Sequence, residues 1–141
     1  MIQKQKIIVY GNPRGKGRPR FAYGSGHTYT DAATTEYEGR IKRVFKSENC
    51  FKFEESPITI IIHAYFRVPV SLSKRKMEKM YGTPHTHKPD ADNIAKICLD
   101  ALNGLMYPDD RFVTSLLVEK HYCHDAEERP RVEITVIGGN E

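Results

Sequence analysis

The sequence predicts an α+β protein with a small mixed or antiparallel sheet of about four strands and two main helices packed on it, in one domain spanning residues 1–141. Three observations support this fold class. Apolar residues alternate at every second position in some segments, and they recur every three to four positions in others. These segments follow the order strand, helix, strand, helix, strand, strand. A chain of 141 residues is also long enough to bury one hydrophobic core.

The strands are predicted from β-branched and alternating residues. A first strand is expected at residues 6–10, and the clearest one runs over residues 58–68. The second face of this clearest strand is also partly apolar, which predicts a central strand covered on both sides. Two further strands are predicted at residues 112–120 and 129–134. The short polar connection between them, residues 124–130, indicates a hairpin and excludes a purely parallel wound sheet.

The helices are predicted from apolar stripes and capping residues. Thr30 or Asp31 is expected to cap a helix that ends near Lys46. Residues 71–81 have helical propensity and a dense basic cluster. The last helix is capped by Asp92 or Asn93, stops at Gly104, and has an apolar stripe of Ile94, Ile97, Cys98, Ala101, Leu102 and Leu105.

Charge is divided unevenly along the chain. Residues 1–46 contain ten Lys and Arg against three Asp and Glu, a net charge of +7, and residues 47–89 carry +3. From residue 90 onward the net charge is −6, so the total is +4. This division favours a basic surface for a polyanion and a separate acidic site, and unevenly solvated surface charge is the alternative.

The most basic loop is Gly-Asn-Pro-Arg-Gly-Lys-Gly-Arg-Pro-Arg, directly after the first strand. It is not a nucleotide-binding Walker loop, because Gly11 and Gly15 are one residue too close. We expect it to contact a nucleic-acid backbone, with a flexible solvated loop as the alternative. Likewise, the basic cluster of residues 71–81 is either an arm over phosphate or a solvated helix. The predicted DNA-binding residues are Arg14, Lys16, Arg18, Arg20, Lys74, Arg75, Lys76, His87 and Lys88.

Several classes of protein are not expected. The sequence has no apolar run long enough to span a membrane and no signal peptide at its start. Three widely separated cysteines favour a reducing cytoplasm over a disulfide framework. His85 and His87 could bind zinc, but no further ligand pair has finger-like spacing, and Cys123-His124 is not such a pair. Zinc is therefore not expected.

The acidic segment lies between Lys88 and Asp110. Asp90 and Asp92 would point to the same side of an extended chain, and Asp92, Lys96 and Asp100 follow at four-residue steps on one helical face. A capped helix with a surface ladder of charges would explain part of this pattern. It would not explain Asp90 or the return of Asp109 and Asp110 after a turn, which we expect to bring Asp110 near Asp90 and Asp92. Clustered carboxylates repel one another unless a cation such as Mg²⁺ compensates them.

Taken together, Asp90-Ala91-Asp92-Asn93-x-x-Lys96, Asp100-Ala101-Leu102-Asn103-Gly104 and Asp109-Asp110 resemble the signature of RusA-type Holliday-junction resolvases. The likeness extends to the Gly-Lys-Gly-Arg-Pro-Arg-Phe loop and to Pro84-His85-Thr86, and His87 stands where relatives often have lysine. The resemblance implies a RusA-like homodimer that nicks two opposed strands of a four-way junction or other branched DNA. It assigns Asp90, Asp92 and Asp110 to Mg²⁺, for which Mn²⁺ can substitute, and Lys96 to catalysis. Asp109 and Asp100 are expected as supporting neighbours, with Asp100 as a tether for Lys96.

Two other functions remain open at this point. A binding protein could clamp branched nucleic acid without cutting it. A metal-dependent nucleotidyl- or glycosyltransferase could use the same Asp-x-Asp ligands, but the chain is short for such an enzyme and lacks a recognisable nucleotide-binding half.

Overall fold

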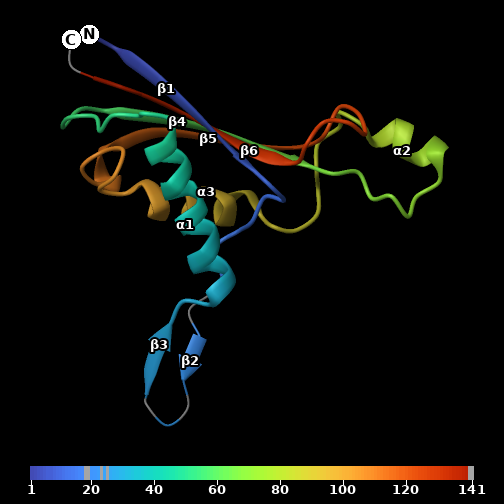
Figure 1. The fold of residues 1–141 in the computed structure, drawn as a ribbon, viewed down its shortest axis with the longest axis horizontal. Coiled ribbons are helices and arrows are strands. Elements are labelled where there is room, and N and C mark those ends of the chain that lie inside the picture. Colours follow the sequence, from blue (N-terminus) through green and yellow to red (C-terminus); the bar gives the residue numbers. More distant parts are fainter. Residues whose placement is uncertain (18–19, 23, 25, 140–141) are drawn as a thin grey trace.

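The computed structural model describes residues 1–17, 20–22, 24 and 26–139. In this part of the chain a four-stranded sheet, two long helices and several smaller elements form the α+β architecture that the sequence predicts (Figure 1). In chain order the elements are β1 (Gln3–Tyr10), β2 (Arg20–Ala22), β3 (His27–Tyr29), α1 (Ala32–Ser47), β4 (Ile58–Phe66), α2 (Lys74–Met80), α3 (Ala91–Leu102), the 3-10 turn η1 (Asp110–Phe112), β5 (Val113–Tyr122) and β6 (Arg131–Gly138).

The main sheet has the strand order β1-β6-β4-β5. Strand β6 pairs antiparallel with both β1 and β4, whereas β5 pairs with β4 in parallel. The sheet is therefore mixed, as predicted, but the expected hairpin between the last two strands is wrong. β4 lies between β5 and β6, because the long apolar β4 supplies both of them with a partner, and residues 124–130 pass across its end.

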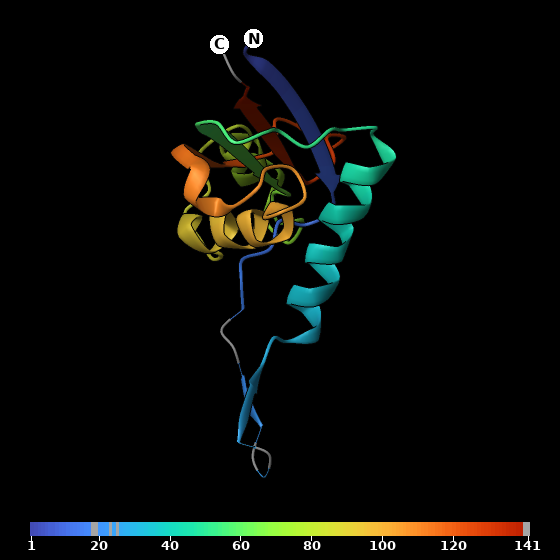
Figure 2. The same cartoon turned by 90° about the vertical axis from the view of Figure 1, so that its left-hand side faces the viewer.

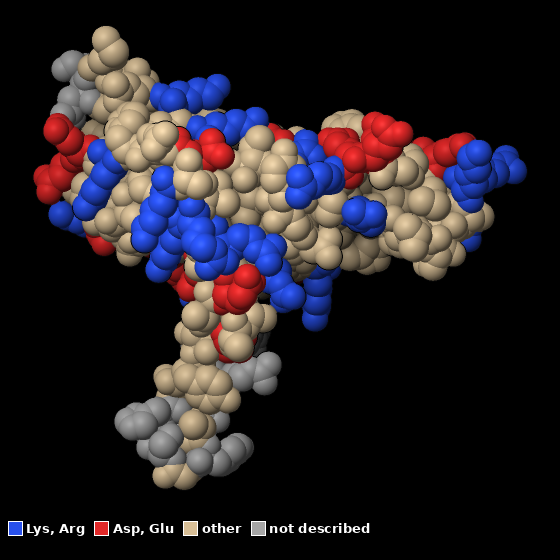
Figure 3. Space-filling model, viewed as in Figure 1, with Lys and Arg blue, Asp and Glu red and all other residues tan. Residues whose placement is uncertain are grey.

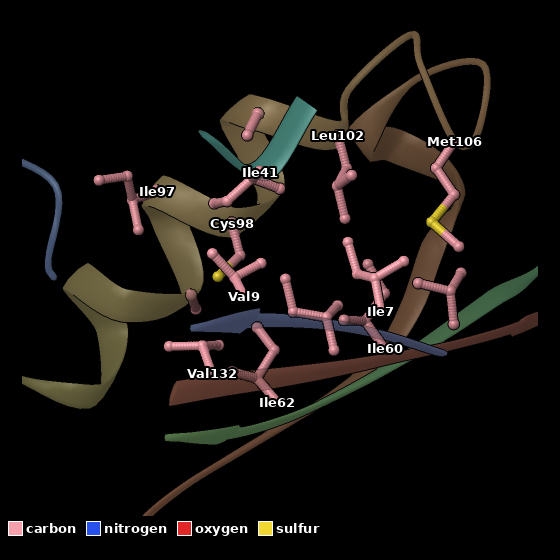
Figure 4. Packing of buried hydrophobic residues seen from close by; sticks show 14 of the residues in the cluster. Ile7, Val9, Ile41, Ile60, Ile62, Ile97, Cys98, Leu102, Met106 and Val132 are labelled. Atoms are coloured by element: carbon pink, nitrogen blue, oxygen red, sulfur yellow. The ribbon is translucent and has the colours of Figure 1, made fainter. Parts of the chain in front are cut away.

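The core lies between one face of this sheet and the helices α1 and α3 (Figure 4). Alternate residues of β4, namely Ile58, Ile60, Ile62 and Ala64, are buried in it, as are Ile97 and Leu102 of α3. The other face of β4 carries Ile61, His63 and Tyr65, which are only half-buried. The prediction that β4 is covered on both sides is thus wrong, because Figures 1 and 2 place α1 and α3 on the same side of the sheet.

Helix α1 begins as predicted from its cap. The Asp31 carboxylate accepts a hydrogen bond of 2.8 Å from the backbone nitrogen of Thr34. Helix α2 is shorter than expected, starts after the capping Ser73 and buries none of its residues. None of the described helices is long and apolar enough to cross a membrane.

Two elements project from the body of the molecule. The β2–β3 hairpin extends beyond the start of α1, and α2 lies at the far end of the sheet from the two termini (Figures 1 and 2). The sequence did not predict the hairpin, because strands of three residues are too short to show a period of two.

Candidate active site

Asp90 occupies the position that should cap helix α3, yet its side chain makes no capping hydrogen bond. The sequence pattern predicts the cap two or three residues later. At the other described helical N-termini, Asp31, Ser73 and Asp109 all accept a hydrogen bond from the backbone. Asp90 is exposed, so its carboxylate faces solvent at the start of α3. The local structure therefore leaves this carboxylate free for another ligand.

Asp92 and Lys96 follow on the exposed surface of α3, one helical turn apart. A surface ladder of charges would require ion pairs between Asp92, Lys96 and Asp100 along this face. Within the described residues neither Asp92 nor Lys96 forms an ion pair, and Asp100 instead lies 3.0 Å from the Lys16 ammonium. The expected tether between Asp100 and Lys96 is thus wrong, since another cation occupies Asp100.

Asp110 is held at the opposite end of the segment. Its carboxylate accepts a 3.0 Å hydrogen bond from the Tyr107 hydroxyl, and its backbone nitrogen donates to the Asn103 side chain. Burial raises the pKa of the Asp110 carboxyl above its ordinary value, the Tyr107 hydrogen bond opposes this rise, and the charges of Asp100 and Asp109 add to it. Asp109 itself caps the turn η1 by accepting from the Arg111 nitrogen.

The turn at Pro108 brings Asp110 beside the second half of α3, through its contacts with Tyr107 and Asn103, and its approach to Asp90 and Asp92 stays a prediction. Within the described residues, the carboxylate oxygens of Asp90, Asp92 and Asp110 do not all lie within 4.8 Å of one another. Mg²⁺ commonly uses only one or two protein carboxylates and takes its other oxygens from water and phosphate. An exposed, oxygen-only set with unengaged carboxylates on Asp90 and Asp92 suits such an ion.

The basic loop after β1 runs directly against the start of α3. The backbone nitrogen of Lys16 donates a hydrogen bond of 2.9 Å to the backbone carbonyl of Asn93. A Cβ on Gly15 would lie 2.9 Å from the Cβ atoms of both Pro89 and Asn93, so only glycine permits this approach. Gly15, Pro89 and Asn93 line a cleft of about 620 Å³. Arg14, Lys88 and Asp90 line the same cleft. The glycine thus brings basic residues and the candidate carboxylate to one cleft.

The side chain of Lys16 forms ion pairs inside the protein. Its ammonium lies 2.8 Å from Glu38 of α1 and 3.0 Å from Asp100 of α3, and its side chain is only 16% exposed. Although burial lowers its pKa, the hydrogen bonds to Glu38 and Asp100 raise the pKa above the ordinary value. The Lys16 charge is therefore paired within the protein, and its contact with DNA stays a prediction.

The other predicted basic residues are distributed over several elements. Arg14, His87 and Lys88 are exposed near the cleft, and Lys74, Arg75 and Lys76 are exposed on α2. Figure 3 shows Lys and Arg gathered over α1 and at the projecting end formed by α2. Arg18 lies outside the described residues, and only the backbone of Arg20, in β2, is described.

Comparison with known proteins decides the family. Residues 10–137 match the family model of the endodeoxyribonuclease RusA. The chain belongs to the RusA endodeoxyribonuclease family. It is also 35% identical over 138 residues to the uncharacterized protein YqaN of Bacillus subtilis strain 168, a match that covers 93% of this chain and 94% of that protein.

Membership of the RusA family confirms the resemblance seen in the sequence and places the chain among DNA-cleaving hydrolases. The matched residues include the basic loop, α3 and η1, so the candidate site lies entirely within the RusA match. Two residues of this site were missed from the sequence. The Tyr107 hydroxyl donates a hydrogen bond to Asp110, and Glu38 forms an ion pair with Lys16. In the sequence, Tyr107 looks like a core aromatic residue and Glu38 like a surface residue of a helix, so neither could be assigned to the site.

Proposed function

We propose that this RusA-family chain is a Mg²⁺-dependent endonuclease that resolves four-way DNA junctions by paired nicks in opposed strands, with Mn²⁺ as a substitute metal. The observation that carries the proposal is the carboxylate of Asp90, which stands at a helix N-cap without capping. It lines the same cleft as Arg14 and Lys88. A carboxylate beside two cations suits a site in which metal and phosphate meet.

The residues that would hold the metal are Asp90, Asp92 and Asp110. Held by these carboxylates, Mg²⁺ would lower the pKa of a bound water and would polarise the scissile phosphate. Lys96 lies one turn beyond Asp92 and, within the described residues, no acid neutralises it. Its ammonium can therefore stabilise the negative charge that develops on the phosphate.

The DNA-binding surface extends away from the cleft. Arg14 and Lys88 would meet the backbone next to the cut, because they share the cleft with Asp90. Lys74, Arg75 and Lys76 of α2 would contact a more distant duplex arm, because α2 projects from the far end of the sheet (Figure 1). A four-way junction is wide enough to engage both places, whereas a short linear duplex engages fewer of them.

Paired nicks require two active sites, and we propose a homodimer formed through β5. This strand is at the edge of the sheet, and its Leu116 and Leu117 are 44% and 47% exposed. The unpaired backbone N–H and C=O groups of an edge strand are a template for pairing with another chain. Light scattering should give the mass of a dimer for the wild type, and Leu117→Lys should shift it to a monomer. A monomeric wild-type protein would contradict this interface.

The decisive activity test uses a labelled four-way junction and a linear duplex of matched sequence. With Mg²⁺ or Mn²⁺ we expect symmetric nicks in opposed strands of the junction, no cleavage with EDTA, and little cleavage of the duplex. Tight junction binding without nicks in any divalent metal would favour the non-cleaving DNA-binding protein instead.

A further inference from the structure

A second cluster of metal-ligating side chains lies on the open face of the sheet. It consists of His63 on β4 and of Glu119 and His121 on β5. The parallel register pairs His63 with Glu119, and His121 is two residues further along β5, so all three project from the same face. Within the described residues this is the one set of three His, Cys, Asp or Glu side chains whose ligand atoms all lie within 4.8 Å.

The three ligand atoms form a compact triangle. His63 Nδ1 lies 3.1 Å from His121 Nε2 and 3.6 Å from Glu119 Oε1, and His121 Nε2 lies 3.3 Å from the same Oε1. Tetrahedral bonds of about 2.0–2.1 Å would set their ligand atoms about 3.4 Å apart. The observed triangle therefore matches the spacing around one tetrahedral metal ion.

The imidazole rings are positioned by their neighbours. Tyr65 stacks on His121, with ring centroids 5.1 Å apart, and the Arg131 guanidinium lies over the Tyr65 ring at 4.0 Å from its centroid. The two histidine side chains are 31% and 25% exposed, so solvent can still reach the cluster. Ordered rings at a partly open site favour binding of an ion from solution.

We propose that His63, Glu119 and His121 bind one divalent transition-metal ion, of which Zn²⁺ is the test case, with water completing the tetrahedron. Two imidazoles and one carboxylate suit zinc and neighbouring transition metals, whereas Mg²⁺ prefers oxygen ligands alone. This site is separate from Asp90 and Asp92, because helix α3 covers the other face of the sheet. A bound metal ion would link β5 to β4, because its ligands come from both strands. The proposal departs from the expectation that zinc is absent, which considered only ligands close together in the sequence.

The test is calorimetric titration of the metal-free full-length protein with Zn²⁺ in the presence of excess Mg²⁺. We expect one Zn²⁺ per chain and a rise in Tm of roughly 5 °C or more at saturating Zn²⁺. His121→Gln and Glu119→Gln should each weaken binding by about 100-fold or more, since they remove a direct ligand. Circular dichroism identifies any variant that fails to fold, in which case the remaining single variant decides.

Two matched controls separate this site from other metal-binding groups. His87→Gln removes an exposed histidine elsewhere, and the double variant Asp90→Asn/Asp92→Asn removes the proposed catalytic carboxylates; both should keep wild-type Zn²⁺ affinity. The proposal is overturned if the wild type shows no saturable binding at micromolar Zn²⁺. It is equally overturned if folded His121→Gln binds like the wild type, or if only the Asp90/Asp92 double variant loses zinc. Because activity is not measured, failure here leaves the junction-cleavage proposal standing.

Discussion

The Lys16 ammonium lies 3.0 Å from the Asp100 carboxylate, so the basic loop after β1 is bound to helix α3 by an ion pair. The same ammonium lies 2.8 Å from Glu38 of α1. One lysine thus joins three segments around the candidate active site and fixes the wall of the cleft beside Asp90.

Replacing Lys16 by methionine should reduce stability and cleavage together. The change leaves Glu38 and Asp100 without their cation, which we expect to cost roughly 1–3 kcal/mol of unfolding free energy. Urea denaturation measures this loss. Arg14→Met is the matched control: Arg14 is exposed, so its replacement should weaken DNA binding and leave stability unchanged. Equal stability of both variants would contradict the structural role of Lys16.

The two aspartates at helix N-caps should respond differently to alanine. Asp31→Ala removes a real capping bond and should cost about 1 kcal/mol. Asp90→Ala removes none, and its unfolding free energy should stay within about 0.5 kcal/mol of the wild type. Thermal or urea unfolding of the two variants tests this contrast. A loss at Asp90 as large as that at Asp31 would show that Asp90 caps α3 after all.

Much of the fold follows from local sequence patterns. The four strands of the main sheet and both main helices were predicted, because period-two and period-3.6 patterns of apolar residues report burial directly. The pairing of the last two strands was not predicted correctly. The hairpin expected between β5 and β6 was inferred from their short connection, whereas β4 lies between them in the sheet. The sequence also indicated that Asp90 is not needed to cap α3, and its side chain makes no capping hydrogen bond.

Contacts between distant segments could not be predicted in the same way. His63 is 56 residues from Glu119, and only the parallel pairing of β4 with β5 joins them. Tyr107 reads as a core aromatic until its hydroxyl meets Asp110. The place of Asp110 depended on the path of the loop after Gly104, where φ is +75° and the chain turns back tightly on Tyr107.

Helix α2 should contribute to DNA affinity without contributing to the core. Lys74, Arg75 and Lys76 are exposed, and the helix buries no residue. Changing all three to glutamine should weaken junction binding and flatten its dependence on salt, by roughly one unit of logarithmic slope for each phosphate that the variant no longer neutralises. Binding measured over a range of salt concentrations tests this, with Tm as the control. An unchanged slope would remove α2 from the DNA surface.

His85 should make stability depend on pH. Burial, with the charges of Lys120 and His87, lowers its pKa from 6.5 to about 4, and its ring stacks on Phe66 at 3.6 Å. Between these two values the unfolded chain binds a proton that the folded chain does not, so stability falls as pH drops from 6.5 towards 4. His85→Phe keeps an aromatic ring without a titrating group, and its stability should fall less over the same interval. Parallel curves for both proteins would contradict this assignment.

The most direct test of the proposed active site is cleavage of a labelled four-way junction in Mg²⁺ by the wild type, by Asp90→Asn and by Asp92→Asn, with binding measured on the same samples. We predict paired nicks for the wild type, loss of cleavage in both variants, and junction binding that is unchanged or tighter because a negative charge has been removed. Wild-type cleavage by folded Asp90→Asn and Asp92→Asn would contradict the proposed site, because the unengaged carboxylates at the start of α3 would then have no catalytic role.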